Sequence, residues 1–145
     1  KVCWDDELVI VTPPGHPLTE NPLSGVDALL EYPFISREEG SGTRNVIVDY
    51  LQSAGRDISD LNLTMEFGSP ESIKSAVVAG LGISILSIAT LNKELELGML
   101  SKLSLDPPLT RPFSIVYQRQ KFRLRAMDEF LEFTEAHCGE KQAAK

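Results

Sequence analysis

The stretch GSPESIKSAVVAGLGISIL, residues 68–86, contains the signals of a helix followed directly by a buried strand. Ser69 is of a type that caps helix N-termini, and Pro70 suits the first helical position because that position needs no amide donor. Gly80 is typical of a helix end. The apolar run from Gly82 to Leu86 then predicts a buried strand. This stretch therefore predicts one helix-to-strand unit of an α/β fold.

Similar units are expected on both sides of this stretch. Apolar β-branched runs predict strands, and amphipathic runs with Ser or Gly at their ends predict helices. Because strand and helix alternate about four times, we expect a parallel sheet covered on both faces. The expected strands are 7–14, 34–36, 61–67 and 113–118. The expected helices are 24–31 with Ser24 as N-cap, 44–55, 87–100, and a C-terminal helix with Leu124, Met127, Phe130, Leu131 and Phe133 on its apolar side; residues 106–112, DPPLTRP, are expected to break regular structure.

The composition restricts the classes of protein to which the chain can belong. Its 145 residues suffice for one compact domain or two small lobes. No apolar run approaches the roughly 20 residues of a membrane-spanning helix, so no membrane association is expected.

The net charge of −7 disfavours nucleic-acid binding by this chain itself, because phosphate contacts need a basic surface. The two cysteines, Cys3 and Cys138, fit free thiols in a reducing cytoplasm, and a bridge between them stays open as the alternative.

The segment from Ser41 to Thr43, at the start of an expected helix, is a candidate anion site. Exposed amides at a helix start carry positive partial charge, and the glycine allows a ligand to approach the backbone. The hydroxyls add donors, while Arg37 and Arg44 are candidate charge partners. The alternative is a plain N-cap. The Gly-Lys-Ser/Thr ending of a P-loop is absent, so a small carboxylate or oxyanion fits better than a nucleotide.

Two further serines are candidates for the same site. Ser69 begins the helix of the opening stretch, and the alternative is again a plain N-cap. Ser36 lies at the tip of an expected strand, where its hydroxyl either contacts a ligand or satisfies a neighbouring backbone group. In α/β sheets ligands bind beyond the carboxyl ends of the strands, toward which helix starts point. Both helix starts are therefore expected at the same sheet edge.

The sequence offers little for catalysis. His16 stands in a Pro-rich turn and His137 stands near the C-terminus, and neither is in a context typical of a catalytic triad. No Gly-x-Ser-x-Gly motif is present, and potential metal ligands do not cluster along the sequence. We therefore expect no enzyme activity, no metal and no cofactor.

Three motifs, in this order and spacing, resemble the effector-binding region of LysR-type transcriptional regulators. They are the strand end PGHPL at 14–18, the loop SGTR at 41–44, and the helix-to-strand passage VAGLGI at 78–83. The resemblance implies two α/β lobes like those of type 2 periplasmic binding proteins, joined by two crossing strands. Those strands would lie near residues 9–12 and 114–117.

The resemblance also implies a division of this chain. Residues 1–12 would be a remnant of the first lobe and the first crossing strand, and residues 13–112 would be the second lobe, with a mainly parallel sheet flanked by helices. Residues 113–145 would be the second crossing strand and a C-terminal helix that returns to the first lobe. Most of the first lobe and the N-terminal helix-turn-helix would then be missing from this chain.

By the same resemblance, a small anionic effector would bind in the cleft between the lobes and control DNA binding and transcription by the full-length protein. Ser36, Ser41, Gly42, Thr43 and Ser69 would form the second-lobe half of that site. The intact protein would associate as a dimer or tetramer and bind DNA only through its helix-turn-helix. The alternatives are a periplasmic-type solute-binding protein for a small anion and a two-lobed enzyme acting on a small carboxylic acid.

Overall fold

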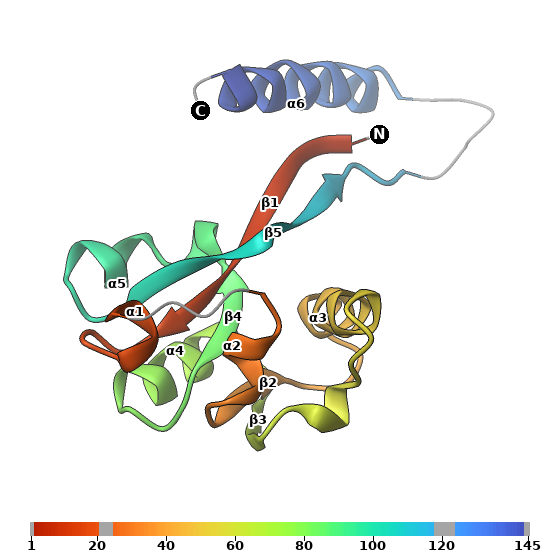
Figure 1. The fold of residues 1–145 in the computed structure, drawn as a ribbon. Coiled ribbons are helices and arrows are strands. Elements are labelled where there is room, and N and C mark those ends of the chain that lie inside the picture. The colour runs from red at the N-terminus through yellow and green to blue at the C-terminus, as the bar shows by residue number, and fades with distance from the viewer. Residues whose placement is uncertain (1, 21–24, 118–123, 144–145) are drawn as a thin grey trace. The chain divides into compact units, whose positions relative to one another are not determined.

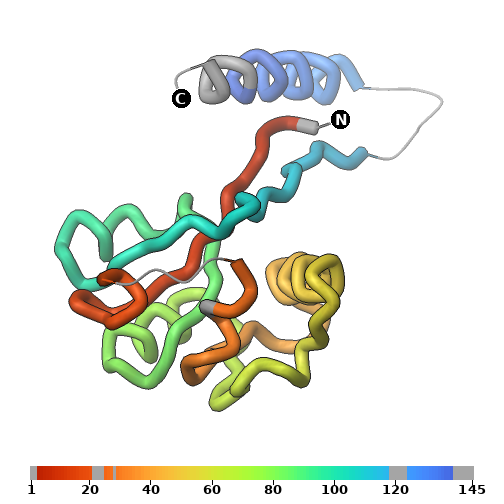
Figure 2. The backbone as a smooth tube through the Cα atoms, in the orientation of Figure 1, coloured from red at the N-terminus to blue at the C-terminus, as the bar shows by residue number. Residues whose placement is uncertain are grey.

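The computed structural model describes residues 2–20, 25–117 and 124–143 (Figure 2). The chain divides into two compact units. The central unit is one continuous segment, Glu7–Leu109, and the terminal unit combines Lys1–Asp6 with Thr110–Lys145. Across the described ranges, no helix has both the length and the apolar character that a membrane crossing requires.

Most helices and strands belong to the central unit, and two long strands extend into both units (Figure 1). Those two strands are β1, Val2–Thr12, and β5, Ser101–Ser114. The other strands are β2, Phe34–Arg37, β3, Leu63–Phe67, and β4, Ser84–Ser87. The helices are α1, Pro17–Glu20, α2, Asp27–Leu30, α3, Gly42–Ser53, α4, Pro70–Val78, α5, Asn92–Glu96, and α6, Arg125–Ala143, with single 3-10 turns η1, Ile58–Asp60, and η2, Ile88–Thr90.

The strands of the central unit confirm the α/β class. β2 and β3 pair in parallel, and Phe34 of β2 forms a parallel bridge with Ile83, just before β4. β4 also joins a sheet of order β4-β1-β5. The pairing of β1 with β4 is antiparallel, so the expectation of a parallel sheet is wrong for β1. A buried apolar run has the same pattern in either direction, which is why the sequence does not show this reversal.

The hydrophobic core has two parts, on opposite faces of these strands. Along β1, Leu8 and Ile10 belong to one cluster, while Val9 and Val11 belong to the other, as the alternation of a strand requires. Helix α3 covers the first face and α4 covers the second (Figure 1). The expected covering of both faces is therefore confirmed. The helix side chains that do this are Ile47, Tyr50 and Leu51 of α3 and Ile73, Ala76 and Val77 of α4.

Helix α4 has the predicted boundaries. Ser69 is its N-cap and its hydroxyl accepts a hydrogen bond from Ser72 N at 3.2 Å. Gly80 follows the helix with φ of 77°, a left-handed conformation that glycine adopts without strain. By contrast, the helix expected over 87–100 is only the turn η2 and the short α5. The expected N-cap Ser24 lies outside the described residues.

Strand β5 differs most from expectation. Residues 106–112, expected to break regular structure, lie inside this strand, while residues 115–117 of the expected strand 113–118 lie beyond its end and Gln118 is outside the described part. β5 is at the edge of its sheet. A proline on an edge strand removes an amide that has no partner on its outer side, so the DPPLTRP segment is compatible with strand there.

The terminal unit contains the start of β1, the end of β5 and α6. Its two cysteines, Cys3 and Cys138, are joined by a disulfide, so the bridge, and not the pair of free thiols, is the state in the structure. On α6, Leu131 is buried as expected. Phe130 and Phe133 are exposed, and so is Leu124 before the helix, so the expected apolar side is covered only in part. Periodicity indicates an apolar side but not how much of it a neighbouring element covers.

Candidate functional site

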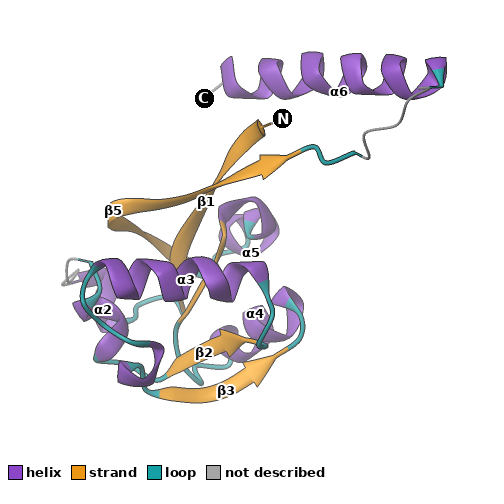
Figure 3. Cartoon of the chain, turned by 90° about the vertical axis from the view of Figure 1, so that its right-hand side faces the viewer, coloured by secondary structure: helices purple, strands orange, loops and turns teal. Residues whose placement is uncertain are grey.

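The site predicted from sequence lies at the carboxyl ends of β2 and β3. Ser36 pairs with Glu66 and Arg37 pairs with Phe67, so the two parallel strands end side by side (Figure 3). Glu38 N also donates to Phe67 O at 3.2 Å and extends the pairing by one residue. The loops that follow lead into α3 and α4. The two candidate helix starts therefore leave the same strand edge, as the sequence predicts.

At the start of α3, Ser41 is the N-cap residue in an extended conformation, and it is 6% exposed. Its amide donates to Glu38 O at 3.1 Å and its carbonyl accepts from Asn45 N at 3.0 Å, but its hydroxyl makes no capping hydrogen bond. Thr43 is also buried. Gly42 between them is exposed, and a Cβ added there would meet no atom within 4 Å. The structure therefore leaves open space beside the Gly42 backbone.

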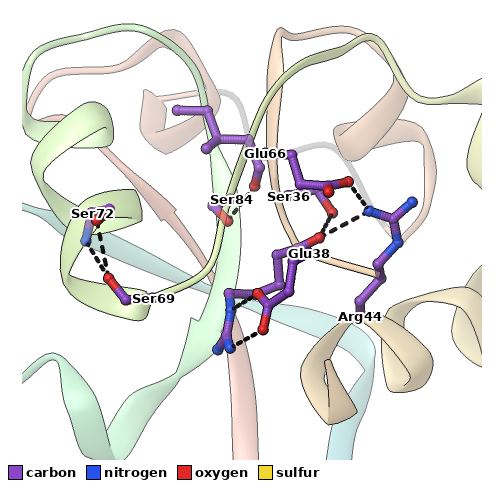
Figure 4. A network of polar contacts seen from close by, with 9 residues as sticks. Ser36, Glu38, Arg44, Glu66, Ser69, Ser72 and Ser84 are labelled. Atoms are coloured by element: carbon purple, nitrogen blue, oxygen red, sulfur yellow. Dashed lines mark hydrogen bonds and ion pairs between the residues drawn. The ribbon is translucent and has the colours of Figure 1, made fainter. Parts of the chain in front are cut away.

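At the start of α4, the Ser69 hydroxyl is committed to the helix. It accepts from Ser72 N, and its oxygen lies 3.0 Å from Ser72 Oγ (Figure 4). The capping role, which the sequence left as the alternative, is therefore present in the structure. The hydrogen bond with Ser72 Oγ uses either the second lone pair or the proton of Ser69, so Ser69 can donate to an anion only when Ser72 Oγ is the donor in that bond.

Ser36 lies within β2 and is 2% exposed. Its hydroxyl donates to Arg37 O at 2.9 Å, so it satisfies a neighbouring backbone group, which was the second of its two predicted roles. Ser84 on β4 lies in the same network and was missed by sequence reasoning (Figure 4). Its hydroxyl donates to Ile35 O at 2.6 Å. The feature of the sequence that could have identified Ser84 is its position as the one polar residue in the apolar run GISIL, residues 82–86.

The arginines near the site are both paired with carboxylates. Arg37 makes two hydrogen bonds to Glu38, at 2.7 and 2.9 Å. Arg44 donates to Arg37 O at 2.9 Å and forms an ion pair with Glu66 (Figure 4). The hydrogen bonds between Arg37 and Glu38 raise the pKa of Arg37 and lower the pKa of Glu38. The sequence made both arginines candidate charge partners for a ligand; in the structure each is paired with a partly exposed carboxylate, which reduces the positive charge that a ligand would meet.

This arrangement offers backbone amides and hydroxyls rather than net charge. Such dipoles hold a small anion at a helix start. No group of His, Cys, Asp and Glu that could hold a metal ion occurs in the described part of the chain. His16 belongs to the turn before α1: its Nδ1 accepts from Leu18 N at 3.2 Å, and burial lowers its pKa.

Comparison with known proteins matches this chain to one family. The family model of the LysR substrate binding domain covers residues 1–139. The uncharacterized HTH-type transcriptional regulator YeiE of Escherichia coli (strain K12) is 39% identical over 130 residues, which is 89% of this chain and 43% of that protein. The HTH-type transcriptional activator CmpR of Synechocystis sp. is 35% identical over 134 residues, 92% of this chain and 43% of that protein. This chain therefore spans less than half the length of these relatives.

Among solved structures, the fold is similar to the regulatory domain of CcmR from Synechocystis PCC6803, determined in complex with 2-PG. The TM-score is 0.83 and the identity is 31%, and the match covers 95% of this chain and 65% of that chain. The resemblance of the three sequence motifs is thus confirmed by independent similarity over nearly the whole chain. The chain belongs to the LysR family of transcriptional regulators and is a LysR substrate binding domain, the effector-binding part of such regulators.

Proposed function

We propose that this domain binds a small anionic metabolite at the starts of α3 and α4 and thereby controls DNA binding by the full-length regulator. Ser41, Gly42 and Thr43 supply amides and hydroxyls from α3, and Ser69 supplies its hydroxyl from α4. Ser36 supports the strand edge between them. In this proposal residues 13–112 form the second lobe. Residues 1–12 and 113–145 contribute to the first lobe and to the two strands that cross between the lobes. DNA is bound by a helix-turn-helix of the full-length regulator, outside this chain.

The observation that carries the proposal is the parallel pairing of β2 and β3 through Arg37 and Phe67, because it brings both helix starts to one edge. The large majority of buried polar groups in proteins have a hydrogen-bond partner. Ser41 is nine-tenths buried, does not cap α3, and adjoins the open space at Gly42. A small acceptor group placed there would pair with the Ser41 hydroxyl and the first amides of α3.

The charges narrow the class of effector. Arg37 and Arg44 are already paired with Glu38 and Glu66, so a ligand with several negative charges would meet no unpaired cation from these two residues. A singly charged carboxylate or a small oxyanion is better matched to amide and hydroxyl donors. The complex of the related CcmR regulatory domain with 2-PG supports a small ligand for this domain class.

Control of transcription follows from differential affinity. An effector that binds one of two conformations more tightly shifts the population toward that conformation. The shift is limited by the difference in binding free energy, typically about 1–3 kcal/mol. We propose that the intact protein is an oligomer whose DNA-binding parts respond to this shift. The family assignment favours this role over transport by a solute-binding protein.

Calorimetry of this domain with acetate, other small carboxylates, sulfate and inorganic phosphate tests the site. The Cβ of Gly42→Leu would meet no atom within 4 Å and its side chain would extend into the open space, so the variant should abolish binding and leave the melting temperature nearly unchanged. Thr43→Val should weaken binding about tenfold, which corresponds to the loss of one hydrogen bond. Thr64→Val is the matched control: it makes the same chemical change on β3, where the hydroxyl contacts Phe34 O. Equal affinity of the wild type and Gly42→Leu would exclude the site.

A further inference from the structure

The disulfide between Cys3 and Cys138 joins two elements that are far apart in the sequence. Cys3 lies near the start of β1, and Cys138 lies in α6, at a sequence separation of 135. Their Cα atoms are 5.5 Å apart, a distance that a disulfide spans without movement of the backbone. The chain has two cysteines, so no third thiol of the same chain competes with this pairing.

Helix α6 buries few of the side chains whose burial is described, those of residues 125–138. Between residues 125 and 138, the buried side chains are Leu131 and Cys138, which lie seven residues apart and so on the same face. Phe130 and Phe133 remain 65% and 60% exposed. Helices in proteins are stabilised mainly by packing of an apolar face. Because one of these two buried residues is a disulfide partner, the bond contributes directly to the attachment of α6.

We propose that Cys3 and Cys138 are a reversible redox site, in which the disulfide attaches α6 to the start of β1 and the dithiol releases it. The reacting partner is a small-molecule thiol–disulfide couple of the glutathione type. Cys3 is half-buried and Cys138 is buried, so Cys3 is the sulfur that an external partner reaches first.

The exchange takes place in two steps. The Cys3 thiolate attacks one sulfur of glutathione disulfide, which forms a mixed disulfide and releases one glutathione thiolate. The Cys138 thiolate then attacks the Cys3 sulfur, forms the protein disulfide and releases the second glutathione. The two protein thiols lose two protons and two electrons in total, and one glutathione disulfide is reduced to two glutathione molecules. The ratio of reduced to oxidised glutathione therefore sets the state of the bond.

Release of α6 should leave the central unit folded. All residues of both hydrophobic clusters lie between Leu8 and Leu109, within the central unit. Helices α3 and α4 pack on those clusters. Opening of one element while the rest stays closed is a local unfolding event, which amide hydrogen exchange measures directly.

The test is hydrogen exchange of the whole chain, read by mass spectrometry, in buffers of reduced or oxidised glutathione. Alkylation of thiols before digestion reports the fraction of Cys3–Cys138 disulfide. We expect a complete intramolecular disulfide in excess oxidised glutathione and two alkylated thiols in excess reduced glutathione. Amides of α6 should exchange at least about tenfold faster in the reduced chain, whereas those of α3 and α4 should not change.

Variants provide the matched controls. Cys138→Ser should show fast exchange in α6 in both buffers and should retain a glutathione adduct on Cys3. Cys3→Ser should show the same fast exchange. Three results would overturn the proposal: two freely alkylated cysteines in excess oxidised glutathione, equal exchange of α6 in both redox states of the wild type, or faster exchange of α3 and α4 on reduction. The last result would show that the disulfide stabilises the whole fold and not only the attachment of α6.

Discussion

Arg111 and Asp6 connect the two long strands of the molecule: Arg111 Nε on β5 lies 3.0 Å from Asp6 Oδ2 on β1. The Asp6 side chain is 1% exposed, so this ion pair is largely removed from water. The Arg111 guanidinium also lies 5.2 Å from the centre of the Phe113 ring, and that ring meets Trp4 edge to face at 5.3 Å. The arginine of the charged pair thus lies beside a pair of contacting aromatic rings within the terminal unit.

Replacement of Asp6 by Asn should lower the free energy of unfolding by about 2–3 kcal/mol, because Arg111 would keep its charge without the carboxylate. Urea unfolding followed by circular dichroism measures this change. The control is Glu129→Gln, which removes the carboxylate from the exposed pair of Arg125 with Glu129. That variant should unfold like the wild type, since exposed pairs contribute little. Equal stability of Asp6→Asn and the wild type would contradict a stabilising role for the buried pair.

The second prediction concerns acid stability and the Lys74 cluster. Lys74 Nζ lies 2.9 Å from Glu71 Oε1, 2.9 Å from Glu94 Oε1 and 3.0 Å from Thr90 O. The hydrogen bond from Lys74 lowers the pKa of Glu94 below its ordinary value of 4.5. A carboxyl with a depressed pKa in the folded state adds stability above its unfolded pKa and loses it as the pH falls through the folded pKa. Stability should therefore decline below pH 4.5.

Glu94→Gln should remove part of this decline, so the difference in stability between variant and wild type should be largest near pH 7 and should shrink below pH 4.5. Glu71→Gln is the control, because Glu71 contacts the same ammonium group but is 75% exposed. Its effect should be smaller at every pH. Parallel pH profiles for the wild type and Glu94→Gln would show that Glu94 is not the group involved.

The third prediction concerns Gly82, where β2 and β4 approach closely. Ile83 N donates to Pro33 O at 2.8 Å, and a Cβ at Gly82 would lie 2.5 Å from that same oxygen. Gly82→Ala should therefore force the strands apart and cost about 1–3 kcal/mol. Gly68→Ala is the control, because a Cβ at Gly68 meets nothing within 4 Å. Thermal unfolding of both variants compares them, and equal melting temperatures would contradict the close approach.

The fourth prediction separates the two roles of Ser69. Loss of its hydroxyl in Ser69→Ala should destabilise the domain by about 1 kcal/mol, because Ser72 N loses its capping partner. Ser69→Asp keeps an oxygen acceptor for the cap and adds a negative charge, so it should retain stability yet weaken the binding of an anion. Denaturation and calorimetry on both variants check this. An anion affinity of Ser69→Asp equal to that of the wild type would remove Ser69 from the proposed site.

Much of the fold was predictable because apolar periodicity and end signals act locally. Ser69 and Gly80 mark the ends of α4, and the buried runs of β1, β2 and β4 follow directly from their apolar residues. The antiparallel direction of β1 relative to β4 was not predictable, since it depends on the path of the long segment between these two strands and not on the residues of either strand. Residues 106–112 were misread because proline is excluded from central strands but tolerated at an edge, and position in a sheet is a property of the whole fold.

The candidate site shows the same division. That both helix starts leave one strand edge followed from the alternation of strands and helices. The neutralisation of Arg44 by Glu66 did not, because these residues are 22 positions apart and meet only through the register of β2 with β3. The pairing of Cys3 with Cys138 was likewise open, since spacing alone does not determine which thiols meet.

The continuity of the central unit has a consequence for genetics. Residues 7–109 form one continuous segment of the chain, and this segment begins on β1 and ends on β5, which are neighbours in one sheet. Its two junctions with the remaining polypeptide therefore fall on adjacent strands. A recombination event, or a designed chimera, can exchange this segment between related proteins with only two joins, and so transfer helices α3 and α4 together with the strands that carry them while the flanking sequence is retained.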